Sequence, residues 1–90
     1  MRLKLAIRDY ESEAEFDHFD DGSFEAFDVV TAEVVDGAQT GRRLRILVES
    51  NSALARQWNR PGETLTVSVE PPRLAAQVLF AGAFSIEDHP

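Results

Sequence analysis

Hydrophobic and polar residues alternate along much of this chain, which is typical of β-strands with one buried face. Near the N-terminus, Leu3, Leu5 and Ile7 occupy every second position, with charged residues at most of the positions between them. The pattern recurs in residues 63–70, where leucine and valine alternate with threonine and serine. We therefore predict strands over both segments.

A β-hairpin is predicted in the middle of the chain. Residues 24–36 are rich in phenylalanine, valine and threonine, which favour strands. The loop at 36–41 contains two glycines, which can adopt the positive φ that tight turns need. In residues 42–49, Leu44, Ile46 and Val48 occupy every second position and therefore share one face of a strand.

A short helix is expected between this hairpin and the strand at 63–70. Serine and asparagine at 50–52 are N-cap candidates, and residues 53–58 suit about two helical turns. Leu54 and Trp58 are four residues apart, so they share a helix face. We expect this face to plug the sheet.

Two consecutive prolines at 71–72 force an extended break before the last apolar segment. Residues 76–86 are predicted to form one strand, with Val78, Phe80 and Phe84 on the same face. The glycine within this segment indicates a bulge or a close backbone approach.

The acidic segment 9–23 has two interpretations. Acids alternate with Tyr10, Ala14 and Phe16, which favours a continuation of the first strand past a bend. Glutamate and aspartate are poor strand formers, so a loose acidic loop is equally consistent with the sequence. The Asp-Asp-Gly-Ser motif at 20–23 predicts a turn in either case.

The order of these elements is strand, strand, strand, short helix, strand, strand. It resembles the topology of the OB-fold, a five-stranded Greek-key barrel. We therefore predict one all-β, mostly antiparallel domain over residues 1–90. It would be a small five-stranded OB-like barrel with one short helix between strands 3 and 4, and an acidic loop or hairpin arm at about 9–23. An open antiparallel sheet packed by one helix is the rival architecture.

Charge is distributed unevenly along the chain. The 90 residues include 16 acidic and 9 basic side chains, giving a formal net charge of −7. Residues 9–36 contain eleven acids and neither lysine nor arginine, whereas residues 42–73 have six arginines and three glutamates. An acidic balance argues against a general nucleic-acid binder, because phosphates need cations. The separate basic segment weakens that argument without removing it.

Composition also indicates in which cellular compartment the protein is found. Cysteine is absent, so neither a disulfide nor a thiolate ligand can form. No segment approaches the roughly 20 apolar residues of a membrane span. Lys4 and Arg8 interrupt the N-terminal apolar run, which therefore does not read as a signal peptide. We expect a cytoplasmic protein without membrane association.

The sequence shows no convincing catalytic or metal site. Of the two histidines, His89 lies in the C-terminal tail, and His18 and its neighbour Asp17 would point to opposite faces of a strand. Residues 17–28 partly resemble the spacing of an EF-hand calcium loop, but Phe19 occupies a ligand position. We expect no enzymatic activity, no catalytic residues, no cofactor and no bound metal.

The leading functional hypothesis is a non-enzymatic binding or assembly module. It would engage another protein, basic in character, or a second copy of itself through an acidic, phenylalanine-containing surface. The candidate partner-binding residues are Glu11, Glu13, Glu15, Asp17, Phe19, Asp20 and Asp21. The simpler interpretation is that the phenylalanines are core and the acids keep the protein soluble.

The alternative hypothesis is an oligonucleotide-binding barrel, because arginines beside an aromatic ring can stack on bases. Its candidate residues are Arg43, Arg45, Arg56, Trp58 and Arg60. We favour a structural role for Arg43 and Arg45, as ion-pair partners of Glu25, Asp28 or Glu33 on the neighbouring strand. Nucleic-acid binding becomes implausible if the acidic segment borders the face that presents these two arginines.

Overall fold

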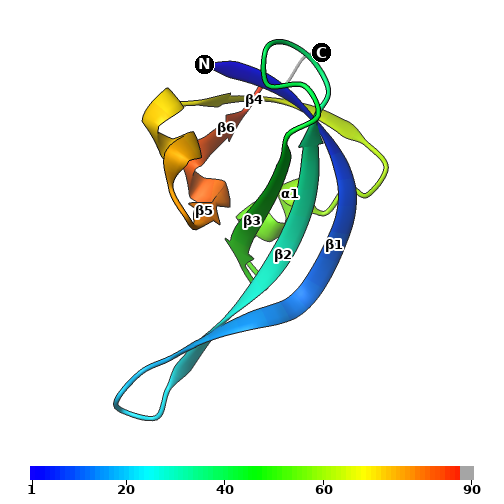
Figure 1. Ribbon diagram of the computed structural model, residues 1–90. Coiled ribbons are helices and arrows are strands. Elements are labelled where there is room, and N and C mark those ends of the chain that lie inside the picture. The colour runs from blue at the N-terminus through cyan, green and yellow to red at the C-terminus, as the bar shows by residue number, and fades with distance from the viewer. Residues whose placement is uncertain (88–90) are drawn as a thin grey trace.

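Within residues 1–87, one mixed six-stranded sheet and a single short α-helix form the framework of the protein (Figure 1). The computed structural model describes residues 1–87. The elements in chain order are β1 (Arg2–His18), β2 (Phe24–Val34), β3 (Arg43–Glu49), α1 (Ala53–Trp58), β4 (Thr64–Val69), the 3₁₀ turn η1 (Pro71–Ala75), β5 (Leu79–Phe80), the 3₁₀ turn η2 (Ala81–Ala83) and β6 (Phe84–Ile86). The predicted mostly β fold, with a helix between the third and fourth strands, is confirmed.

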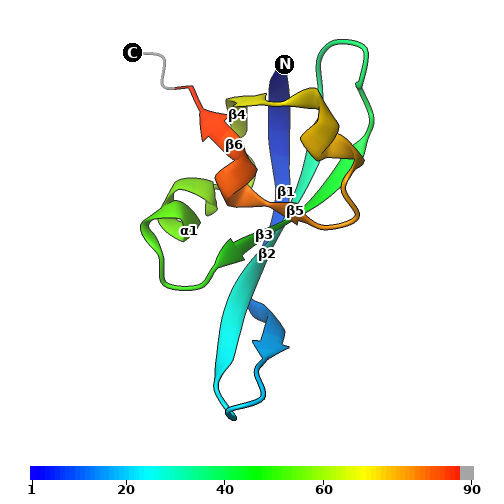
Figure 2. The ribbon, with the colours of Figure 1, turned by 90° about the vertical axis from the view of Figure 1, so that its left-hand side faces the viewer.

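The strands lie in the order β5-β3-β2-β1-β4-β6, and the sheet is open. A closed five-stranded barrel is therefore not confirmed. The segment 76–86, predicted as one strand, is divided in two: β5 pairs in parallel with β3, and β6 pairs antiparallel with β4. Only the residues of η2 separate β5 from β6, so one short turn connects the two opposite edges of the sheet (Figure 2).

This division also changes which side chains of the segment are buried. Phe84 is 5% exposed and packs in the core, but Val78 and Phe80 are 51% and 49% exposed. The prediction that these three share one face is wrong, because the turn η2 interrupts the alternation. Gly82 lies within η2 with open space around it, so it is neither a bulge nor a close approach.

The core lies inside the curled sheet and is sealed by α1. The predicted inward positions of β1, β3 and β4 are all buried: Leu3, Leu5, Ile7, Leu44, Ile46, Val48, Leu65, Val67 and Val69. Ser52 caps α1 by accepting a hydrogen bond from the backbone N–H of Ala55 at 3.1 Å. Trp58 is fully buried against Phe84, with 5.6 Å between ring centroids, and Leu54 packs at the core edge, as the helix spacing predicted.

A bulge in β1 keeps two consecutive charged residues out of this core. Ile7 pairs with Ala32 and Asp9 pairs with Thr31, so Arg8 is an extra residue without a partner in the ladder. Strict alternation would have turned Asp9 inward and Tyr10 outward. The bulge instead leaves Arg8 and Asp9 exposed and returns Tyr10 to the inner face, where it packs against the core.

Candidate functional site

A two-stranded ribbon projects from the body of the molecule, and we call residues 11–27 the arm (Figure 1). β1 continues to His18, so the acidic segment is a strand that continues the first one, and not a loose loop. β4 pairs with β1 only as far as Ala6, and β3 pairs with β2 only from Phe27 onward. Among residues 1–87, no third strand therefore pairs with either edge of the arm, apart from the Phe27–Glu49 pair where the arm joins the body. Isolated two-stranded ribbons are marginally stable in water. The stability of the arm therefore depends on contacts at its root, where it joins the body of the protein.

The carboxylate of Asp28 organises the root of the arm. It accepts hydrogen bonds from the Ser50 hydroxyl at 2.5 Å, from the backbone N–H of Glu13 at 2.8 Å and from the Tyr10 hydroxyl. Glu13 has a φ of 50° within the second irregularity of β1, between Glu11 and Glu15. Asp28 thus connects β1 and β2 with the loop after β3.

Hydrogen bonds keep the Asp28 carboxyl group ionised. Burial alone would raise the pKa of Asp28, but the hydrogen bonds from Ser50, Tyr10 and Glu13 outweigh it, and the pKa is lowered. Burial and the neighbouring Asp28 carboxylate raise the pKa of the Tyr10 hydroxyl above its ordinary value. Asp28 is therefore a buried, ionised residue that holds β1, β2 and the loop after β3 together. It is not one of the surface acids, and it is not an ion-pair partner of Arg43 or Arg45.

The strand register divides the arm into two chemically different faces. Phe16 lies opposite Ala26 and His18 lies opposite Phe24, which gives one face an aromatic character. The rings of Phe16, His18 and Phe24 contact one another, with centroids 5.7–6.5 Å apart. Phe16 and Phe24 are nevertheless about half exposed, because nothing in the described chain covers them.

The other face of the arm is acidic. Glu15 lies opposite Phe27, and Asp17 lies opposite Glu25. Like charges directly opposite each other in an antiparallel pair destabilise it. The arm contains seven acids and neither lysine nor arginine. Its charge therefore remains largely uncompensated within its own two strands.

The turn at the tip of the arm holds the last three predicted partner-binding residues, Phe19, Asp20 and Asp21. Gly22 has a φ of 88°, and the Asp21 carboxylate accepts hydrogen bonds from the N–H and the hydroxyl of Ser23. These bonds lower the pKa of Asp21. Phe19 is half exposed at this turn. All seven predicted partner-binding residues thus lie on the arm: Glu11, Glu13, Glu15, Asp17, Phe19, Asp20 and Asp21.

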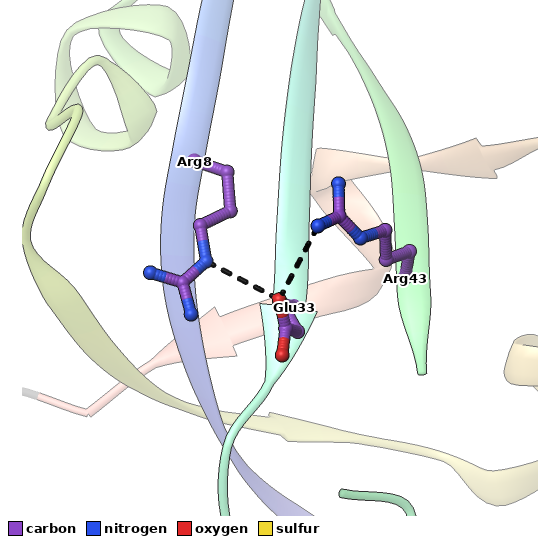
Figure 3. Close-up of polar contacts among 3 residues, drawn as sticks. All are labelled: Arg8, Glu33 and Arg43. Atoms are coloured by element: carbon purple, nitrogen blue, oxygen red, sulfur yellow. Dashed lines mark hydrogen bonds and ion pairs between the residues drawn. The ribbon is translucent and has the colours of Figure 1, made fainter. Parts of the chain in front are cut away.

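The arginines of the outer sheet face are paired with acids. Glu33 on β2 bridges Arg8 on β1 at 3.3 Å and Arg43 on β3 at 3.7 Å (Figure 3). Arg45 forms an ion pair with Glu15 of the arm. Pairing of Arg43 with Glu33 follows the expectation from the sequence, whereas the partner of Arg45 comes from β1 and not from the adjacent strand. The acidic segment therefore borders the arginine face.

The remaining residues of the nucleic-acid hypothesis are not assembled into one surface. Trp58 is fully buried in the core, so its ring offers no face to a base. Arg56, on α1, and Arg60, just after it, are exposed, and Arg60 lies 3.9 Å from Glu63. The arginine and tryptophan positions that look continuous in sequence are thus separated by the fold.

The outer sheet face carries an apolar groove that the sequence pattern did not predict. Its apolar lining residues are Phe16, Phe27, Leu47, Val78 and Phe80, and its acidic ones are Glu15 and Asp17. We call these seven residues the outer groove; its volume is about 270 Å³. Phe27 and Phe80 contact each other with centroids 6.1 Å apart, although they come from distant parts of the chain.

Other kinds of site find little support in residues 1–87. Within that range, no group of three or more histidine or acidic side chains is placed to hold a metal ion. The contacts of the His18 ring are with phenylalanines, and His89 falls outside the described residues. Among the described residues, no helix is long and apolar enough to cross a bilayer.

Comparison of the chain with protein-family models, with curated proteins and with solved structures finds no match. Function must therefore be argued from the geometry of the arm and the sheet.

Proposed function

We propose that this chain is a non-enzymatic binding or assembly module that engages a protein partner through its acidic arm. The observation that carries the proposal is the arm itself: a protruding ribbon with seven acids, exposed Phe16, Phe19 and Phe24, and no covering element among residues 1–87. Exposed rings close to concentrated charge are typical of surfaces that steer a partner and then bury an aromatic anchor.

The arginine pairing favours this proposal over oligonucleotide binding. A strand of phosphates approaching Arg45 would also approach Glu15, and the repulsion would oppose binding. The aromatic ring that stacking would require, Trp58, is buried. A basic protein meets neither obstacle.

We also propose that the fold is OB-like. If β5 and β6 are counted as two halves of one interrupted strand, the chain has five strands in the predicted order, with the helix after the third. The parallel pairing of β5 with β3 and the antiparallel pairing of β6 with β4 support this interpretation.

Capture of partners from native lysate, with and without nuclease, tests the proposed function. The variant carries serine in place of Glu11, Glu13, Glu15 and Asp17, and we expect it to lose the protein partners that the wild type retains. A matched control replaces four exposed acids outside the arm with serine: Asp9, Asp36, Glu63 and Glu70. Unchanged protein capture by the arm variant would refute the proposal, and capture that depends on nuclease-sensitive material would favour nucleic acid.

A further inference from the structure

The outer groove combines an apolar floor with acidic neighbours on both sides. Phe27 lies between Glu15 of β1 and Glu49 of β3 in the strand register. One step toward the arm tip, Asp17 and Glu25 face each other on the same side of the ribbon. Four carboxylates thus surround the apolar residues of the outer groove. The cation Arg45 lies beside them and pairs with Glu15.

The apolar side chains of the outer groove do not contribute to the hydrophobic core. Leu47 and Phe80 pair across β3 and β5 on the outer face, opposite the buried Ile46 and Leu79. Val78 and Phe80 are each about half exposed. Burying apolar side chains of this size is favourable by roughly 25 cal/mol per Å², so the groove gains from a partner that covers it.

The size and charge of the groove select the kind of occupant. Small-molecule sites usually enclose about 300–1,000 Å³, and this groove, at about 270 Å³, is slightly smaller and partly open to solvent. It suits one or two apolar side chains of a polypeptide. The facing Asp17 and Glu25 would be stabilised by a cation placed between them, because this removes their mutual repulsion.

A second copy of this chain fits less well than a separate basic protein. Five of the nine lysine and arginine side chains already form ion pairs with acids of the same chain: Arg2, Arg8, Arg43, Arg45 and Arg60. A second copy would also bring its own acidic arm close to the first. A partner with unpaired cations avoids both costs.

We infer that the outer groove binds an extended segment of a protein partner in which lysine or arginine alternates with large apolar residues. The apolar side chains lie on Phe27, Leu47, Val78 and Phe80, and the cations reach Asp17, Glu25 and Glu49. This inference rests on the proposed protein-binding function and gives it a location and a partner chemistry.

Three labelled synthetic peptides test the inference in the full chain: one alternating lysine with leucine, one lysine with serine, and one glutamate with leucine. Fluorescence anisotropy measures affinity, and amide chemical shifts report the site. We expect the lysine–leucine peptide to bind most tightly, with the largest shifts at Leu47, Val78 and Phe80. Equal binding of the lysine–serine peptide, or no binding of the lysine–leucine peptide, would overturn the inference.

Matched variants locate the binding. Phe80→Ser and Val78→Ser remove apolar contact outside the core, and each should weaken the lysine–leucine peptide about tenfold. Asp17→Asn should weaken it about threefold and reduce its salt dependence. Phe19→Ser is the control, because Phe19 is 50% exposed at the tip of the arm and does not line the groove; it should stay within about twofold of wild type. An effect of Phe19→Ser equal to that of Phe80→Ser contradicts the inference.

The outcomes separate this inference from the proposed function. Peptide shifts confined to the arm tip would overturn the groove and leave arm-mediated binding intact. Sedimentation that shows a wild-type dimer lost in Phe80→Ser would assign the groove to a second copy, which also overturns the inference. Neither result depends on the lysate experiment with the arm acids.

Discussion

Replacing Asp28 by asparagine should destabilise the protein by about 1–3 kcal/mol. The substitution keeps the size of the side chain but removes a charge that accepts hydrogen bonds from Ser50, Glu13 and Tyr10. Hydrogen bonds to charged groups contribute roughly 1.5–3 kcal/mol each, but they are not additive, and the asparagine oxygen can keep two donors. A small domain is stable by only about 5–15 kcal/mol, so the loss is easily measured.

The assay is urea unfolding as a function of pH. Because the pKa of Asp28 is lowered in the folded state, its stabilisation is present above the unfolded-state pKa and is lost as the pH falls through the folded-state pKa. The difference between wild type and variant should therefore be constant at neutral pH and shrink below about pH 3.9, the ordinary aspartate value. Hydrogen exchange should also accelerate around Glu13.

Two comparisons make this result specific to the root of the arm. Tyr10→Phe alone should cost about 1 kcal/mol, and combining it with Asp28→Asn should cost less than the sum, because both remove the same contact. Glu11→Gln, an exposed acid nearby, should stay within about 0.5 kcal/mol. A loss for Asp28→Asn below about 0.5 kcal/mol, or one that does not change with pH, would refute the reasoning.

Other predictions follow from the same structure. Glu25→Gln should stabilise the protein by about 0.2–1 kcal/mol, since Asp17 then faces a neutral group, and added salt should diminish the gain in thermal unfolding; a loss of stability would contradict the register argument. Glu33→Gln should cost less than about 1 kcal/mol at low salt, and nothing measurable in concentrated salt, because Arg8 and Arg43 are both about half exposed or more. Trp58→Ala should cost about 3–5 kcal/mol in urea unfolding, and a mild effect would argue against its place in the core. Millimolar calcium should leave the melting temperature unchanged, and a rise of several degrees would show that the acidic turn binds the ion.

Local patterning was sufficient to predict most of the body. The alternation around Leu44 and Val67 identified inward positions, and the glycines at 37 and 41 both adopt the positive φ expected of the hairpin loop. These features depend on neighbours in sequence and on burial of one face. Propensity alone could not decide whether the acidic segment is a strand, because its pairing with β2 and its contacts with Asp28 and Arg45 depend on the fold.

The alternation of hydrophobic and polar residues could not predict contacts between segments far apart in the sequence. The interruption at η2 moves Val78 and Phe80 outward, and pairing of Phe80 with Leu47 joins residues far apart in the chain. Asp28 is a different case, because it shares the parity of Val30 and the following inward residues of β2. That signal was present in the sequence, and the surrounding acids obscured it.

The connection between the two sheet edges has a consequence for how the chain acquires its structure. Residues 79–86 complete both edges, β5 on β3 and β6 on β4, and they come after every other strand in the sequence. During synthesis, β1 to β4 must wait as an incomplete sheet with two unpaired edges, which are templates for pairing with other chains. Completion of these two edges then depends on contacts of high sequence separation, which form slowly. A chain shortened before Leu79 would keep both edges exposed permanently, and its failure would be aggregation through those edges and not the simple loss of a terminal strand.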